Sequence, residues 1–355
     1  MKLTNPYQGL TPLTEIQLLP LVGKRMNVFK PWLSALSVAK FLVLGLGFIA
    51  THVAEGLSKI GQVTVTYRSL SGVKGVYADL LRGMVELVRV NPTVDRDLLA
   101  SLVKNSDTVI NLIGVLSGSE TTLREAHVTV PELLASLIAK QSPSTMLIHV
   151  SASNVMGPVG SFITEEPRHC EGARPSNLYE ETKCLGERVV YSTWLSSGFP
   201  MAIVRPTLVY GRYAAHSQFM QMFNVARLGV VPMLKVRVMT ISAVKLTELF
   251  ARLHADRPRG LYMYATECEP VPISRFIEDM AKALGRRIIK VPVPNQLLKL
   301  ALPSDIKPLY RYVGVTYDCG RMRSMVSGLR FMDEEVYENA LFIKRLREMH
   351  IHGDN

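Results

Sequence analysis

The stretch Leu44–Leu57, "LGLGFIATHVAEGL", decides the fold. An apolar run, "VAKFLVLG", leads into it, and a helical pattern follows. Gly45, Gly47 and Ala50 form G-x-G-x-x-A between a predicted strand and a predicted helix, which is the context that this pattern needs. Gly45 permits a tight turn, Gly47 lets the backbone approach a pyrophosphate, and Ala50 allows close helix–strand packing. The stretch therefore predicts a dinucleotide-binding turn.

The helix after this turn begins at Phe48. Phe48, Ile49 and Ala50 make its first turn, whose free N–H groups and positive dipole suit phosphates. Glycines in such a turn can also serve packing alone. The position of the turn at the first predicted strand favours a dinucleotide.

Short apolar, β-branched runs alternate with helical patterns along the first two thirds of the chain. Strands that are buried on both faces and joined by crossover helices indicate a parallel, doubly wound α/β sheet of the Rossmann type. The predicted strands are "VAKFLVLG", "QVTVTYR", "VELVRV", "DTVINLIG", "STMLIHVS" and "MAIVRP", and the helical patterns cover residues 48–59, 95–104, 121–141 and 177–197.

After Pro206 the pattern changes to mixed helices and short strands, with more Pro and Met. We therefore expect an N-terminal extension over residues 1–36 and an NAD(P)-binding Rossmann domain over 37–210. A smaller region over 211–355, for substrate or partner binding, is expected to interleave with the sheet.

The second predicted strand ends "VTVTYRS", where an acidic residue would bind a ribose 2′-hydroxyl. Arg68 and Ser69 stand there instead. Arginine suits a 2′-phosphate, so NADP(H) is favoured over NAD(H). The alternative is that Arg68 is a solvated strand end. Asn91 and Gly114 follow the next two strands and are expected to border the adenine and the ribose.

A second set of polar residues follows the later strands. "LIHVSASNVMGP" places Ser151 and Ser153 at a strand's carboxyl end, where ligands bind in open α/β sheets. In "SNLYEETKCLGERVV", Tyr179 and Lys183 are four residues apart and share one helix face. An ammonium beside a phenol favours the phenolate, which makes tyrosine usable as an acid or base. Two solvated residues would give the same spacing.

These motifs, followed by "AIVRPTLVYGR", resemble in their order the extended short-chain dehydrogenase/reductase family. The resemblance implies that Tyr179 is the acid/base and that Lys183 lowers its pKa and holds the nicotinamide ribose. It also implies that Ser151 or Ser153 orients a substrate oxygen and that Pro206 lines the nicotinamide. Met156 stands where the family commonly has tyrosine.

Six segments, among them "HVTVPELLASLIAK" with Pro131, resemble more narrowly the NAD(P)-binding accessory subunits of mitochondrial respiratory complex I. This resemblance implies a structural NADPH, other complex I subunits as partners, and peripheral contact with the matrix side of the inner membrane. It implies no turnover. The alternative is an active NADP(H)-dependent dehydrogenase, reductase or epimerase of the extended type.

The formal charge is +11, and the basic residues are scattered. No dense Lys/Arg run with aromatics appears, so we expect no nucleic-acid partner. The charge suits an anionic lipid, an acidic protein or a phosphorylated cofactor equally well. The first forty residues are basic and acid-poor, which suggests an organelle-directed extension. The longest apolar stretch, Phe41–Ala50, is too short to span a bilayer, so no transmembrane helix is expected.

The 4 cysteines show neither C-x-x-C spacing nor a zinc pattern. We expect reduced thiols and no metal. One further segment, residues 291–314, carries leucines beside Lys299, Lys307 and Arg311. It suits a membrane surface or partner as well as a helix packed on the sheet.

Overall fold

The computed structural model describes residues 38–157, 160–165, 170, 172–293, 311–351 and 353. The expected N-terminal extension and most of the leucine-rich segment 291–314 lie outside these residues.

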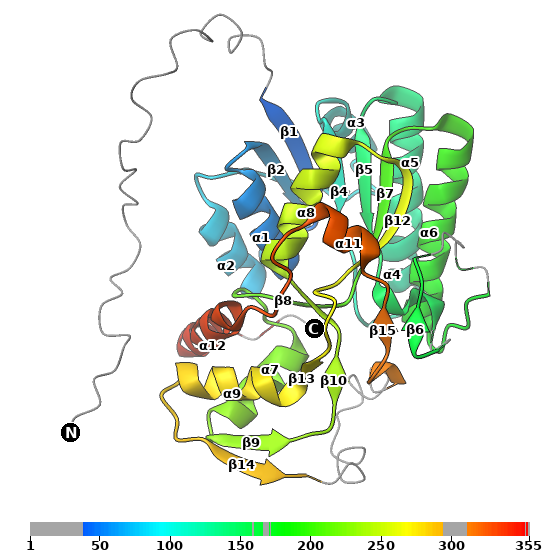
Figure 1. Cartoon of the computed structure of the whole chain (residues 1–355). Helices are drawn as coiled ribbons and strands as arrows, with labels where there is room; N and C mark the ends of the chain where they lie inside the picture. The colour runs from blue at the N-terminus through cyan, green and yellow to red at the C-terminus, as the bar shows by residue number, and fades with distance from the viewer. Residues whose placement is uncertain are drawn as a thin grey trace, which may run out of the picture. The chain divides into compact units, whose positions relative to one another are not determined.

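Seven parallel strands form the central sheet, in the order β12-β7-β5-β4-β1-β2-β3 (Figure 1). The predicted doubly wound α/β fold is confirmed, because the strand order reverses at β1, which has β4 on one side and β2 on the other. The strands are β1 (Ala39–Leu44), β2 (Gly61–Tyr67), β3 (Glu86–Arg89), β4 (Thr108–Asn111), β5 (Met146–Val150), β7 (Met201–Pro206) and β12 (Arg259–Ala265).

Helices cover both faces of this sheet (Figure 1). Alternate residues of β1 show why: Phe41 and Val43 pack toward α1, α2 and α8, whereas Leu42 and Leu44 pack toward α3, α5 and α6. The helices are α1 (Phe48–Leu57), α2 (Val73–Leu81), α3 (Arg96–Lys104), α4 (Glu120–Arg124), the π-helix η1 (Glu125–Thr129), α5 (Val130–Gln141), α6 (Leu178–Ser197) and α8 (Ala243–Asp256).

Two of these elements were not anticipated from the sequence. Helix α2 contains Gly75 and follows Gly72, which obscure its helical pattern. Strand β12 comes from residues after 210, yet it pairs in parallel with β7 and completes the sheet. Sequence from the C-terminal region therefore belongs to the central layer.

The rest of the C-terminal region packs helices against short two-stranded ribbons. Aromatic rings join them: Phe276 of α9 lies edge-on to Tyr210 and Phe331, at centroid distances of 5.4 and 4.9 Å. The remaining elements are the 3-10 turn η2 (Ser153–Met156), β6 (Phe162–Ile163), β8 (Leu208–Tyr210), α7 (Ser217–Ala226), β9 (Val230–Met233), β10 (Arg237–Val238), β11 (Thr240–Ser242), β13 (Val271–Pro272), α9 (Ile273–Ala283), β14 (Ile289–Pro292), β15 (Thr316–Tyr317), α11 (Gly320–Met325) and α12 (Asp333–Glu348).

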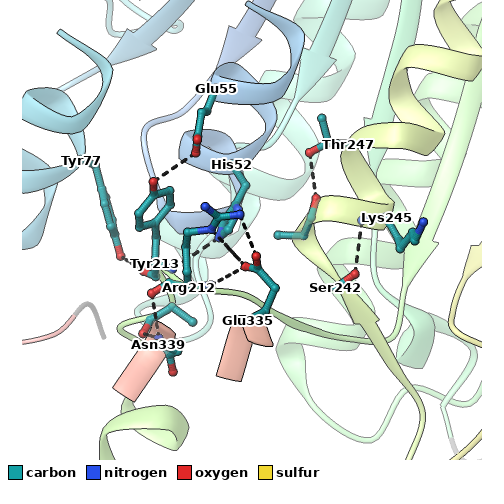
Figure 2. Close-up of polar contacts among 12 residues, drawn as sticks. His52, Glu55, Tyr77, Arg212, Tyr213, Ser242, Lys245, Thr247, Glu335 and Asn339 are labelled. Atoms are coloured by element: carbon teal, nitrogen blue, oxygen red, sulfur yellow. Dashed lines mark hydrogen bonds and ion pairs between the residues drawn. The ribbon is translucent and has the colours of Figure 1, made fainter. Parts of the chain in front are cut away.

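The segment after β8 fastens the last helix to the first (Figure 2). Arg212 donates to both carboxylate oxygens of Glu335 in α12, at 2.8 and 3.3 Å. His52 of α1 accepts from the Tyr213 N–H at 3.4 Å. Burial, and then the charge of Arg212, lowers the pKa of His52 to about 3, so this histidine is neutral. Asn339 of α12 donates to two carbonyls of the same segment.

A buried ion pair attaches helix α6 to the sheet. Arg205 of β7 donates from Nε and Nη2 to the two carboxylate oxygens of Glu187, at 2.9 and 2.6 Å. The side chains are 2% and 0% exposed. The Arg205 guanidinium also lies over the rings of Tyr262 and Tyr264 in β12, at 5.3 and 5.5 Å. Glu187 raises the pKa of Arg205 despite the opposing effect of burial.

Breaking this pair from one side should destabilise the whole domain. Glu187→Gln leaves a buried guanidinium without its counter-charge, which typically costs about 3–5 kcal/mol. Glu181→Gln on the same helix is the matched control. Its side chain is 49% exposed and 3.8 Å from Arg124, so we expect a loss below about 1 kcal/mol. Denaturant unfolding of the two variants checks the difference, and equal losses would contradict it.

Candidate functional site

The predicted site residues lie along one edge of the sheet or on α6. Those at the sheet follow or end a parallel strand at its carboxyl end, where doubly wound folds bind ligands. They are Gly45, Gly47, Phe48, Ile49 and Ala50 after β1, Arg68 and Ser69 after β2, Asn91 after β3, Gly114 after β4, Ser151 and Ser153 after β5, Tyr179 and Lys183 on α6, and Pro206 at the end of β7.

The turn between β1 and α1 leaves open space beside Gly47. Gly45 has φ +93° and its N–H donates to Thr66 Oγ1 at 3.2 Å, so the turn requires glycine there. Gly47 has φ −142°, and a Cβ placed on it would meet no atom within 4 Å. Helix α1 starts at this residue without a side-chain cap or an acidic residue in its first turn. The open space and the helix N-terminus fit a pyrophosphate.

Two arginines lie side by side beyond the next strands. Arg89 at the end of β3 donates from Nε to the Arg68 carbonyl at 3.3 Å, and both side chains are exposed. Arg89 was not singled out from the sequence, because only the pairing of β2 with β3 brings it beside Arg68. Ser69 Oγ lies 3.4 Å from Ser71 Oγ. Two exposed arginines at the ends of adjacent strands favour an anion at this end of the site.

Asn91 makes its hydrogen bonds within the turn that follows β3. Its N–H donates to Asp95 at 2.7 Å, and its side-chain oxygen accepts from the Thr93 hydroxyl at 3.1 Å. The residue thus shapes the loop from β3 to α3 at the edge of the expected adenine position.

Lys183 lies buried between the ends of β4 and β5. Its Nζ donates to the Val150 carbonyl at 3.3 Å, and a Cβ on Gly114 would lie 3.3 Å from the same nitrogen. Burial lowers the pKa of Lys183 to about 8, against the opposing charge of Glu187 one turn along α6. The lysine is positioned to donate to a ligand group at this edge.

Two buried histidines beside Lys183 were missed in the sequence. His127 of η1 accepts at Nε2 from the Val115 N–H at 3.2 Å, so its proton is assigned to Nδ1, 2.9 Å from Thr182 Oγ1. His149 Nδ1 faces the Asn111 amide nitrogen at 3.3 Å. Burial and the Lys183 charge lower the pKa values of His127 and His149 to about 2 and about 3. Both histidines are therefore neutral. Both pack against residues that are distant in the sequence.

Close packing of α6 against η1 holds this arrangement. A Cβ on Gly186 would lie 1.9 Å from the His127 carbonyl, so only glycine fits there without a shift of the helix. Tyr179 lies edge-on to the His127 ring at 5.3 Å. The helix that carries Tyr179 and Lys183 is thus fixed on two sides, by Gly186 and by the ion pair of Glu187.

Tyr179 is half-buried beside a fully buried carboxylate, Glu180. The Glu180 oxygens accept from the Tyr312 hydroxyl at 2.7 Å, from Ser176 N–H at 2.7 Å and from Asn154 at 3.2 Å. Burial, and then the Glu180 charge, raises the pKa of Tyr179 to about 12. The expectation that Lys183 lowers this pKa does not hold in the cofactor-free structure, because the negative Glu180 is the charge that acts on the phenol.

The two candidate serines differ in surroundings. Ser151 is buried, and its hydroxyl has no hydrogen-bond partner among the described residues. Ser153 begins η2, and its hydroxyl interacts with Tyr317 and lowers the pKa of that phenol against the larger effect of burial. Tyr317 belongs to β15, which pairs with β6 next to this site.

Cys170 and Cys184 form a disulfide that packs against Tyr179, Ala152 and Val155. The expectation of four reduced thiols is therefore wrong for these two. The fold brings their Cα atoms to 5.7 Å, a usual separation for a disulfide, although 14 positions separate them in sequence. Cys268 and Cys319 are free thiols.

The sequence over residues 41–231 matches the family model of the NAD dependent epimerase/dehydratase family. The chain belongs to this family. The match covers more than half of the 355 residues and includes every candidate site residue. The broader resemblance to extended short-chain dehydrogenases is thereby confirmed.

Individual relatives in this family share limited sequence with the chain. A UDP-N-acetyl-alpha-D-glucosaminuronate decarboxylase of Bacillus cytotoxicus is 28% identical over 184 residues. The aligned part is 47% of this chain and 53% of the relative, so the chain spans about half the length of this curated relative. The relatives give no support to the narrower resemblance to a complex I subunit, which stays a prediction.

Solved structures of other proteins share the fold. A UDP-glucuronic acid 4-epimerase from Bacillus cereus in complex with NAD has a TM-score of 0.68 at 14% identity, covering 86% of this chain and 99% of that one. A dTDP-glucose 4,6-dehydratase from Bacillus anthracis in complex with NAD has a TM-score of 0.67 at 15% identity, with coverages of 87% and 98%.

The described residues contain neither a metal-ligand cluster nor a membrane-spanning helix. No group of three or more possible metal ligands lies together in this part of the chain. None of its helices combines the length and apolar character needed to cross a membrane.

Replacing Gly47 with valine should block dinucleotide binding without unfolding the protein. The backbone at φ −142° accepts any side chain, and the surrounding space is open. The valine would fill the position of the pyrophosphate, so we expect the dissociation constant for the dinucleotide to rise at least roughly 100-fold. The change at the helix N-cap should lower the free energy of unfolding by about 1 kcal/mol or less. Calorimetric titration checks binding, with Gly47→Ala as an intermediate case. Full nucleotide occupancy in the valine variant would refute the site.

Lys183 should make the cofactor-free protein less stable than a neutral variant below about pH 8. Its pKa falls from 10.5 in the unfolded chain to about 8 in the folded one. Between these values the unfolded chain holds the extra proton, so stability rises with pH. Lys183→Met should therefore raise the free energy of unfolding by roughly 3 kcal/mol at pH 7. This gain should shrink as the pH rises and vanish by about pH 10.5.

Denaturant unfolding at several pH values measures this gain. Lys140→Met, on an exposed position of α5, is the control and should show the same pH profile as the unsubstituted protein. A gain that does not change between pH 7 and 10.5 would contradict the buried, partly neutralised lysine.

Proposed function

We propose that this chain is a dinucleotide-holding accessory subunit, similar to the NAD(P)-binding accessory subunit of mitochondrial complex I. In this proposal NADP(H) stays bound as a structural cofactor and is not turned over. The motif similarities in sequence support it, as do the open space beside Gly47 and the raised pKa of Tyr179.

The environment of Tyr179 is the observation that carries the proposal. A general acid or base works best with a pKa near the working pH. Here burial and the adjacent Glu180 carboxylate raise the pKa of the phenol to about 12. Lys183, the residue expected to oppose this shift, donates to the Val150 carbonyl instead. The constellation is retained, but its charges favour holding a ligand over moving a proton.

The choice of NADP(H) follows from the arginines. Arg68 follows β2 and Arg89 ends β3, and no acidic side chain lies at the described end of β2. A 2′-phosphate would receive charge-assisted hydrogen bonds from this pair. When bound, the dinucleotide would be held by the turn at Gly47, by these arginines and by Lys183. Its nicotinamide would supply hydride chemistry only if a substrate reached it.

The proposed partners are other subunits of complex I, on the matrix side of the mitochondrial inner membrane. The basic, acid-poor first forty residues suit an organelle-directed protein. The net charge of +11 suits contact with an acidic protein or an anionic membrane surface.

A second candidate is an active NAD(P)-dependent epimerase, dehydratase or decarboxylase acting on a nucleotide sugar. The similar proteins favour this reading more directly, since those named above act on UDP- or dTDP-linked sugars. Tyr179, Lys183 and the unpartnered Ser151 hydroxyl also suit it. In this case a substrate and the cofactor would have to bring the pKa of Tyr179 down.

Purification of the native protein, with mass spectrometry of its companions and its bound nucleotide, separates the two. The accessory-subunit proposal predicts co-migration with complex I and release of NADP(H) on denaturation. Tyr179→Phe should then leave complex I assembly and activity nearly unchanged, whereas Lys183→Ala should reduce nucleotide retention and assembly together. A free protein whose nucleotide-sugar conversion collapses in Tyr179→Phe would establish the enzyme instead.

A further inference from the structure

A hollow of about 230 Å³ opens where the ends of three helices of the C-terminal region meet. Arg227 caps α7, Arg286 follows α9 by three residues, and Lys344 and Arg347 lie in the last turns of α12. All four line the hollow, which lies outside the set of residues described for the dinucleotide. Four cationic side chains around one small space indicate a site for an anionic ligand.

The charges of this hollow are not balanced by the surrounding protein. Glu348 is its acidic lining residue, and it lies 4.0 Å from Lys344. Within the described residues, Arg227, Arg286 and Arg347 make no ion pair with a carboxylate. Cations also suit helix C-termini, where the carbonyl ends carry about half a negative charge each. The four positive charges therefore exceed the negative charge that three helix C-termini and one carboxylate supply.

Arg347 is the best-oriented of the four. Its guanidinium lies over the Phe223 ring at 5.2 Å, and one terminal nitrogen donates to the Asn224 side-chain oxygen. Its Nε is buried and has no hydrogen-bond partner in the part of the chain that the structure describes. This Nε is closed to solvent and therefore to a ligand as well. The contacts with Phe223 and Asn224 hold the guanidinium in place, so an acceptor in the hollow would meet a group that is already ordered.

We propose that this hollow binds a phosphate-bearing ligand. Arginine forks match phosphate oxygens in geometry as well as charge, which a simple halide or a carbonyl would not exploit. The space is below the usual 300–1,000 Å³ of pockets for larger organic ligands, so it suits a phosphate or a headgroup and not a whole dinucleotide.

The phosphate could belong to a soluble molecule or to a lipid. Leu228 and Met349, next in sequence to lining residues, are 69% and 45% exposed. Apolar side chains beside a basic hollow suit a phospholipid whose acyl chains stay outside, whereas a soluble phosphate would need only the cations. Both share the same chemistry of recognition, and the inference does not depend on the proposed function.

Calorimetric titration of the full-length protein, saturated with NADPH, tests the soluble source with inorganic phosphate and pyrophosphate at low ionic strength. Flotation with phosphatidylcholine vesicles, with and without phosphatidic acid, tests the lipid source. The test variant is Arg227→Gln/Arg286→Gln, because both residues line the hollow and both side chains are exposed. Arg345→Gln is the control, since this exposed arginine is in the same turn of α12 but does not line the hollow.

We expect the double variant to weaken binding at least tenfold and the control to change it less than twofold. Binding of pyrophosphate alone supports a soluble ligand, and binding to phosphatidic acid vesicles alone supports a lipid headgroup. The proposal is overturned if neither probe binds, or if Arg345→Gln weakens binding as much as the double variant does. The latter result would mean that general positive charge, and not this hollow, attracts the anion.

Discussion

The pairing of Glu187 with Arg205 is the interaction on which the rest of the site depends. It joins the helix that carries Tyr179 and Lys183 to strand β7, inside a core that excludes water. Both partners must be present, because either charge alone would be buried without compensation. The same carboxylate is one helical turn from Lys183 and stabilises its ammonium. One residue therefore both positions the helix and makes its buried cation tolerable.

The site is a collection of positive groups that face one edge of the sheet. These groups would each be stabilised by a bound anion: the N-terminus of α1, the pair Arg68 and Arg89, and Lys183. The histidines next to Lys183 stay neutral. Such an arrangement costs stability in the empty protein and gains it when an anionic dinucleotide binds. A protein built this way can use its cofactor as part of its structure, whether or not hydride transfer follows.

Sequence alone predicted the parts that depend on local pattern. The first six predicted strands, the turn at Gly45 and the helix of Tyr179 each follow from periodicity or from short motifs. It could not predict what depends on contacts between distant segments. The role of Arg89 depends on the register of β2 and β3, and that of His127 depends on the approach of η1 to Gly186. The Cys170–Cys184 bridge joins two residues that are 14 positions apart. The raised pKa of Tyr179 likewise depends on the burial of its phenol in the fold and on the Glu180 charge beside it.

The late arrival of β12 in the sheet has a consequence for how the chain is made. Strand β7 ends at Pro206, and its outer neighbour begins only at Arg259. During synthesis at roughly 5–20 residues per second, the outer edge of β7 waits several seconds for its partner. Until then an apolar strand edge, with Arg205 lacking the rings of Tyr262 and Tyr264, is open to other chains. The length of the segment between Pro206 and Arg259 thus sets how long this edge of the growing sheet stays without its partner.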